Sequence, residues 1–245
     1  HLSLRRQRQM CIRDSLFRTN MTLSSSAENY INTLDRNPEW ISSASAIQKY
    51  LSRYRLENSD RLFQIQQDYS GYTFSPDLNS DYAVRLYFLS DAITAKNQKI
   101  YYTTIDGKAA FSMDNSKTEP YYLIAENGAV WYWDDAVNQY FCLYESIEIM
   151  IEIYALERDY QYHSSFPAKD LASENVKAIM DHFNRHYTFV PECSDRYQYY
   201  WQTDYDLIRI LYNDYEKEYS LVINSVSPYN FQLILDGLKR DNLYL

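Results

Sequence analysis

The spacing of apolar side chains along the chain predicts helices first and strands afterwards. In the N-terminal part, apolar residues recur every three or four positions, as they do on one face of a helix. Helices are therefore expected over residues 25–37, 43–54 and 59–71. Ser25 and Glu28 have the spacing of a capping box for the first of these helices. Gly71 can adopt the left-handed conformation that ends the third.

Runs of aromatic and β-branched residues from Tyr72 onward predict strands. Residues 99–105 and 108–113 flank Asp106-Gly107, and residues 121–125 and 129–133 flank Asn127-Gly128. Both dipeptides tolerate positive φ at the two central positions of a type I′ turn. We therefore expect two antiparallel hairpins, and with a further strand over residues 82–89 a sheet of about five strands.

A helix is expected to close this part of the chain. Ser146 can cap it, and Ile147 and Ile151 begin an apolar stripe with helical spacing. Glu148 and Glu152 fall on the other side, where we expect a solvated face. The alternative is a carboxylate pair for general acid–base catalysis. Helices, then strands, then a closing helix define an α+β fold.

These elements resemble the SUKH superfamily. The similarity lies in the strand and turn from Tyr121 to Gly128, and in Ser146-Ile147, Ile151-Glu152 and Ala155-Leu156 of the closing helix. Tyr69-Ser70-Gly71-Tyr72 is similar to that family's Tyr-Gly-Gly-type turn, with Ser70 replacing the first glycine. The resemblance covers about residues 24–160. It implies a SUKH-like fold and a protein that binds and neutralises a bacterial toxin domain, or, in a minority of the family, a regulatory scaffold.

A boundary is expected near residues 160–169, which lack periodicity and contain Pro167. It divides the chain into a SUKH-like α+β domain over residues 21–164 and a small C-terminal domain or extension over residues 165–245. The second unit has the pattern α-β-β-β-α. Its helices are expected over residues 173–184 and 228–239, and its strands over residues 197–201, 207–212 and 219–224.

The first 20 residues are set apart by their charge. They hold five Arg and one Asp, a net charge of +4, whereas the whole chain has −9, which leaves −13 for the rest (−9 minus 4). Residues 1–15 resemble translated sequencing-adaptor read-through of the kind found in metagenomic sequences. We expect residues 1–20 to be a non-native or disordered leader and Met21 to be the start. A basic targeting arm is the alternative.

The acidic body and the high tyrosine content narrow the choice of partner. An acidic protein lacks the Lys and Arg excess that binds phosphates, so nucleic acid is not expected as a partner. A basic protein, such as a nuclease toxin, is expected instead. The 27 Tyr residues favour strands with one wet face, or alternatively a protein-recognition surface.

Cysteines and hydropathy indicate the compartment. Cys11, Cys142 and Cys193 show neither a CxxC spacing nor a framework of pairs, which is typical of a reducing compartment. The sequence has no apolar run of ~18 residues and no secretion signal, so neither a membrane association nor export is expected. We expect a cytoplasmic protein.

Candidate chemistry is sparse. His182 and His186 have metal-ligand spacing on a predicted helix, with Cys193 nearby as a third ligand, but Phe183 replaces the Glu of the zinc-peptidase motif. Asp134-Asp135 and the pair Asp204 and Asp206 are either turn residues or acidic patches for a basic toxin. The chain has only four glycines, and their spacing fits neither a P-loop nor a Gly-x-Gly-x-x-Gly turn.

The sequence therefore assigns no catalytic, cofactor-binding or metal-binding residue, and the partner-binding residues stay unknown. The leading hypothesis is a non-enzymatic immunity protein that occludes a toxin. A regulatory protein-interaction scaffold of the same fold is the second. A hydrolase or metal-binding protein using His182 and His186 is the third.

Overall fold

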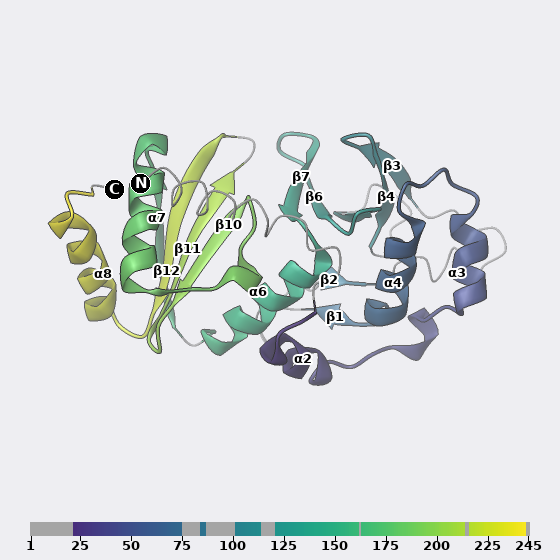
Figure 1. Ribbon diagram of the computed structural model, residues 1–245, viewed down its shortest axis with the longest axis horizontal. Helices are drawn as coiled ribbons and strands as arrows, with labels where there is room; N and C mark the ends of the chain where they lie inside the picture. Colours follow the sequence, from purple (N-terminus) through teal and green to yellow (C-terminus); the bar gives the residue numbers. More distant parts are fainter. Residues whose placement is uncertain are drawn as a thin grey trace, which may run out of the picture.

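The computed structural model describes residues 22–74, 84–86, 101–113, 121–161, 163–213 and 216–243. Two five-stranded antiparallel sheets lie side by side along the long axis of the molecule, and helix α6 (Ile147–Asp159) lies beneath and between them (Figure 1). The expected α+β class is confirmed. The expected leader, residues 1–20, and most of the expected strand over residues 82–89 lie outside the described residues.

Three short helices and a 3-10 turn precede the first sheet. They are α2 (Ser25–Asn32), η2 (Pro38–Trp40), α3 (Ala44–Leu51) and α4 (Ser59–Tyr69). The cap of α2 is Ser24, whose Oγ accepts a hydrogen bond from the Ala27 amide, so the expectation that Ser25 caps this helix is wrong. The helix also ends five residues earlier than expected, because Arg36 instead forms a β-bridge with Tyr72.

The first sheet is a meander in which each strand pairs with the next. Its strands are β3 (Tyr102–Ile105), β4 (Lys108–Ser112), β5 (Tyr122–Ala125), β6 (Val130–Asp134) and β7 (Gln139–Tyr144). The sequence did not predict β7. Two short strands, β1 (Thr73–Phe74) and β2 (Val84–Arg85), form a separate pair.

The two glycine turns of this sheet differ from each other. Asp106 and Gly107 both have positive φ, at 49° and 77°, as the expected type I′ turn requires. In the other hairpin Gly128 has a φ of +91°, but Asn127 is not in the left-handed region, and the Gly128 amide bonds to the Ala125 carbonyl at 2.8 Å. The expected two-residue turn is wrong there. The hairpin has a three-residue loop that ends in a left-handed glycine.

The second sheet has the strand order β8-β12-β11-β10-β9, with helices α7 and α8 on its outer face (Figure 1). The two helices and the three expected strands are confirmed to within two residues, and β8 and β9 are additional. Strand β8 includes Pro167, which an edge strand tolerates. The elements are β8 (Ser164–Leu171), α7 (Ser173–His186), β9 (Thr188–Phe189), η3 (Pro191–Cys193), β10 (Gln198–Gln202), β11 (Asp206–Asn213), β12 (Glu218–Ser225) and α8 (Pro228–Arg240).

Helix α6 packs against both sheets. It is buried on every side from Ile147 to Leu156, and one apolar core contains it together with Tyr200 and Leu207 of the second sheet. At its C-terminal end Glu157 accepts a hydrogen bond of 2.5 Å from Arg209 of β11. The core thus crosses the boundary expected at residues 164 and 165, and the division into two domains stays a prediction.

None of the helices among the described residues is long and apolar enough to cross a membrane.

Candidate functional site

Both carboxylates of α6 are buried, and each contacts a different residue. The exposed fractions of Glu148 and Glu152 are only 3% and 4%, so the expected solvated face does not exist. Glu148 forms an ion pair with Arg61 of α4. Glu152 accepts hydrogen bonds from the backbone amide and the hydroxyl of Ser24, both at 2.6 Å. Each carboxylate therefore holds a different N-terminal helix against α6, and they do not form a catalytic pair.

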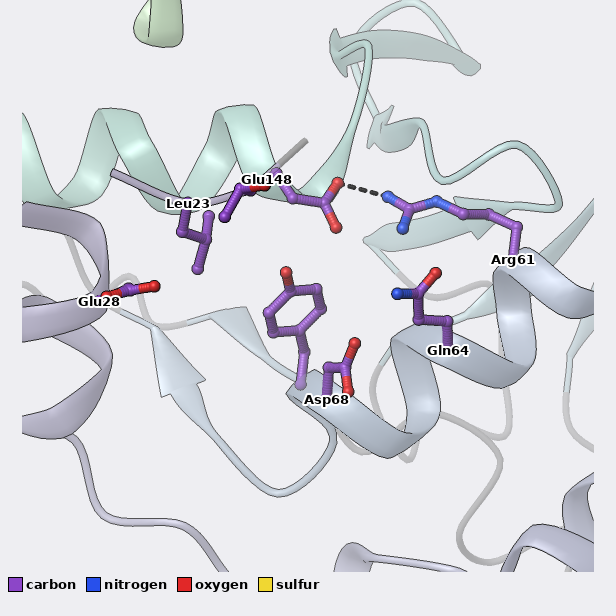
Figure 2. A pocket seen from close by; sticks show the side chains of 8 residues that line it. Leu23, Glu28, Arg61, Gln64, Asp68 and Glu148 are labelled. Atoms are coloured by element: carbon purple, nitrogen blue, oxygen red, sulfur yellow. Dashed lines mark hydrogen bonds and ion pairs between the residues drawn. The ribbon is translucent and has the colours of Figure 1, made fainter. Parts of the chain in front are cut away.

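A polar pocket of about 370 Å³ opens beside the Arg61–Glu148 pair (Figure 2). Tyr69 lines it, and burial followed by the nearby Glu148 carboxylate raises the pKa of this phenol above its usual value. The phenol therefore stays protonated at neutral pH. Glu148 contacts both the Arg61 guanidinium, as an ion pair, and the Tyr69 hydroxyl, so its carboxylate joins the two sides of the pocket. Its lining consists of Thr22, Leu23, Glu28, Arg61, Gln64, Asp68, Tyr69 and Glu148.

Asp195 is a buried carboxylate at the junction of the two sheets. It accepts hydrogen bonds from three backbone amides, those of Glu145 (3.0 Å), Tyr197 (2.8 Å) and Gln198 (3.1 Å). Burial raises the pKa of this carboxyl from 3.8 to about 6, and the amide hydrogen bonds oppose the rise. With its oxygens taken up by backbone donors, Asp195 ties β7 to β10 and has a structural role.

Both described cysteines are free thiols in the interior. Burial raises the pKa of Cys142 from 9.0 to about 12 and that of Cys193 above its ordinary value. A thiol in this state is a poor nucleophile and a poor metal ligand at neutral pH. Cys193 lies in the core around α6 and does not join the histidines of α7, so it is not the third ligand considered from the sequence.

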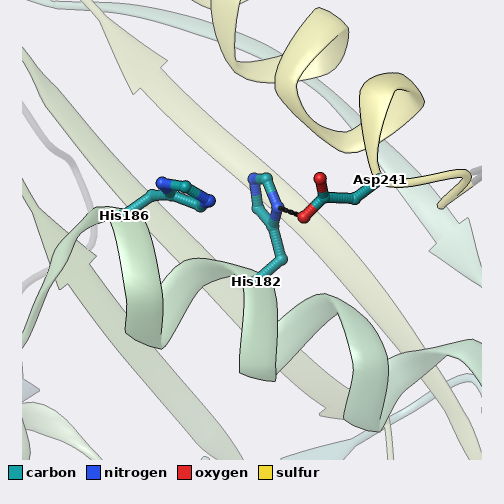
Figure 3. Close-up of side chains that lie close together, drawn as sticks. All are labelled: His182, His186 and Asp241. Carbon is teal, nitrogen blue, oxygen red and sulfur yellow. Dashed lines mark hydrogen bonds and ion pairs between the residues drawn. The ribbon is translucent and has the colours of Figure 1, made fainter.

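His182 and His186 do come together with a third residue, Asp241, just after the end of α8 (Figure 3). One ligand atom of each of the three lies within 4.8 Å of the others. His182 is buried, and its Nδ1 lies 2.8 Å from Asp241 Oδ2. That bond lowers the pKa of the Asp241 carboxyl. Sequence reasoning missed Asp241 because it is 59 residues from His182 and belongs to no motif.

The two acidic pairs singled out in the sequence have different environments. Asp135 accepts hydrogen bonds from the Trp133 indole (2.8 Å) and the Tyr121 hydroxyl (3.3 Å) on the first sheet. At the second sheet Asp206 is buried and accepts a bond of 2.5 Å from Ser225. Its neighbour Asp204 is exposed.

Exposed apolar side chains occur directly after Asp204 in the turn after β10 and near the start of α8. Tyr205 and Tyr229 are 58% and 71% exposed, and the Val226 amide bonds to the Tyr205 carbonyl at 3.1 Å. Tyr229 and Leu233 are four residues apart and lie on the same side of α8. We call this surface the Tyr205 patch and define it by Asp159, Asp204, Tyr205, Val226, Tyr229 and Leu233.

The two carboxylates of the patch, Asp159 and Asp204, both lie near Tyr160. The pKa of Tyr160 is raised by burial and by the negative charges of Asp159, Asp204 and Asp206. The same tyrosine hydroxyl donates to the Thr203 carbonyl at 2.5 Å, which fixes it under the turn between β10 and β11. Large aromatic groups are thus exposed next to two exposed acids, Asp159 and Asp204.

Comparisons with protein-family models, with curated proteins and with solved structures found no match to this chain.

Proposed function

We propose that this protein is a non-enzymatic, SUKH-like immunity protein that neutralises a basic toxin domain by covering it. The Tyr205 patch is the observation that carries this proposal. Tyrosines supply large contact area at low entropic cost and are enriched among the residues that dominate binding energies. Tyr205 and Tyr229 are among the most exposed apolar side chains in the part of the chain that the structure describes.

The charge of the chain favours a basic partner. The whole sequence has a formal net charge of −9. Asp159 and Asp204 place negative charge beside the exposed aromatic groups of the patch. Complementary charge accelerates encounter, and burial of the aromatic groups then provides the affinity.

The buried and half-buried ionisable groups support binding rather than catalysis. Glu148 is paired with Arg61, the half-buried Glu157 with Arg209, and Asp195 with backbone amides. Each is occupied by a contact that holds two elements together. A catalytic acid or base would instead need a free face toward a substrate.

The test uses the product of the gene immediately upstream of this one, which the proposed immunity function predicts to be a toxin domain. Co-expression of this chain is expected to restore growth of cells that produce the toxin, and the purified proteins are expected to form a 1:1 complex without turnover of toxin. Tyr205→Ala combined with Tyr229→Ala should abolish rescue. Tyr102→Ala combined with Tyr121→Ala, which changes two exposed tyrosines on the first sheet, is the matched control and should retain it.

Each outcome has a distinct meaning. Failure of the wild-type chain to bind the upstream product contradicts the immunity function and favours a regulatory scaffold that binds another protein. Rescue that survives the double substitution at Tyr205 and Tyr229 contradicts the assignment of the patch and leaves immunity standing.

A further inference from the structure

We propose that His182, His186 and Asp241 form a binding site for a divalent transition-metal ion, with Zn²⁺ as the best fit. Two imidazoles and one carboxylate are the ligand set that borderline metals such as zinc, cobalt and nickel accept. The site is independent of the Tyr205 patch.

The helices α7 and α8 bring the three ligands together. His182 and His186 are four residues apart on α7, so they project from the same face, and their ring centroids are 4.6 Å apart. Figure 3 shows the His182 ring between the His186 ring and the Asp241 carboxylate, which comes from just past the end of α8, and one ligand atom of each lies within 4.8 Å of the others. Three protein ligands leave a fourth position of a tetrahedral ion open to water.

The direction of His182 determines which nitrogen would bind. A Cβ built on Gly237 of α8 would lie 3.5 Å from Nε2, so this nitrogen faces the backbone of α8. Nδ1 instead lies 2.8 Å from Asp241 Oδ2. The metal would take the place of the proton shared by these two atoms. The proton of a neutral His182 then moves to Nε2, so charge and atoms balance within the site.

The necessary adjustment is small. Ligand atoms of a tetrahedral zinc ion at ~2.1 Å are about 3.4 Å apart, whereas the three ligand atoms here lie within 4.8 Å of one another. His182 is buried and fixed, but His186 and Asp241 are exposed. The two exposed side chains can therefore close on the ion without disturbing the core.

Arg185 would compete with a metal ion for the Asp241 carboxylate. Its guanidinium lies 3.1 Å from Asp241 Oδ2, the same oxygen that bonds to His182. The Arg185 side chain is 61% exposed, so it can swing into solvent when a metal arrives. Its removal should leave Asp241 with His182 as its partner and without the competing positive charge, and so increase the affinity for a cation.

The experiment is a titration of the purified full-length chain with Zn²⁺ and with Co²⁺, followed by calorimetry and by the visible spectrum of bound Co²⁺. We expect one ion per chain. His186→Gln and Asp241→Asn should each weaken binding at least tenfold, and Arg185→Gln should strengthen it about threefold or more. Asp236→Asn is the matched control, because it changes an exposed carboxylate on α8 that is outside the site, and it should leave binding unchanged.

Circular dichroism of each variant without metal shows whether it is folded. Because His186 and Asp241 are exposed, we expect both variants to fold like the wild type, so that weaker binding reports the loss of a ligand. Binding of equal strength in the wild type, His186→Gln and Asp241→Asn would mean adventitious binding elsewhere and would overturn the proposal. Less than 0.1 ion per chain at ~100 μM metal would also overturn it.

Discussion

Glu152 of α6 and Ser24 form two hydrogen bonds of 2.6 Å, one from the Ser24 amide and one from its hydroxyl. The same hydroxyl oxygen accepts from the Ala27 amide at 3.2 Å and so caps α2. One serine therefore satisfies a buried carboxylate and a helix terminus at the same time. Ser24 thus links the start of α2 to α6, in addition to the core contacts of Ala27 and Tyr30.

Ser24→Ala should accordingly destabilise the protein by about 2–3 kcal/mol, since it removes a helix cap and the hydroxyl that donates to the buried Glu152, which keeps only the backbone amide as a donor. Urea unfolding measures the difference. Ser25→Ala is the control, because Ser25 is exposed and lies inside α2. Equal effects of the two substitutions would contradict the role of Ser24.

Arg61→Met should cost about 3 kcal/mol or more, because it leaves the buried Glu148 carboxylate without its ion-pair partner. The double variant Arg61→Met/Glu148→Gln should recover most of that loss, since no charge is then buried alone. Thermal and urea unfolding of both variants provide the comparison. A double variant no more stable than Arg61→Met would show that the ion pair is not the cause.

Gly128→Ala should destabilise more than Gly107→Ala, although both glycines have positive φ. Either substitution strains the backbone by about 1–2 kcal/mol. At Gly128 the added Cβ would also lie 2.8 Å from Arg61 Nε, whereas at Gly107 nothing lies within 4 Å. The Gly128 variant must shift the Arg61 guanidinium, which disturbs its ion pair with Glu148, and should lose about 2–4 kcal/mol in total. Equal unfolding midpoints would contradict this account.

Asp195 should make stability fall as pH rises. The pKa of its carboxyl is raised from 3.8 to about 6 in the folded state, so folding favours the protonated form. The stabilisation that this protonated carboxyl provides is greatest below pH ~4 and declines between pH ~4 and ~6. Above that range the protein has lost about 3 kcal/mol of stability relative to low pH.

Asp195→Asn abolishes this titration. The difference in unfolding free energy between pH ~4 and ~7 should therefore change by about 2–2.5 kcal/mol relative to the wild type. Asp236→Asn, at an exposed site, should keep the wild-type pH dependence. An unchanged pH dependence in the Asp195 variant would show that this carboxyl titrates normally.

Much of the fold could be predicted from local patterns. The helical spacing located α3, α4, α6, α7 and α8, and the strands β10 to β12 follow aromatic and aliphatic runs. The strands β7 and β8 were missed because their sequences contain no clean alternation, and β8 includes Pro167. Their pairing with β6 and β12 is a tertiary effect that no local pattern records.

The main error of the sequence reasoning was to expect Glu148 and Glu152 on a solvated face. A helical wheel places them opposite the apolar stripe, but it does not show that α2 and α4 cover that side. A signal was present nevertheless. Ile149 and Ile153 directly follow these glutamates, so α6 is apolar on nearly all sides, as buried helices are.

The candidate sites were predictable only in part. The spacing of His182 and His186 indicated a ligand pair, but Asp241 reaches them only because α8 packs beside α7 on the outer face of the second sheet. The Tyr205 patch likewise joins the turn after β10, the end of β12 and the start of α8. Residues so far apart in sequence meet only in the folded chain.

The central claim is that this protein acts through the Tyr205 patch on a basic toxin domain. The most direct measurement is the dissociation constant of the purified chain for the product of the upstream gene, for the wild type and the two tyrosine double variants. We expect at least a hundredfold weaker binding for Tyr205→Ala/Tyr229→Ala and less than a threefold change for Tyr102→Ala/Tyr121→Ala. Equal affinity for all three proteins would contradict the claim.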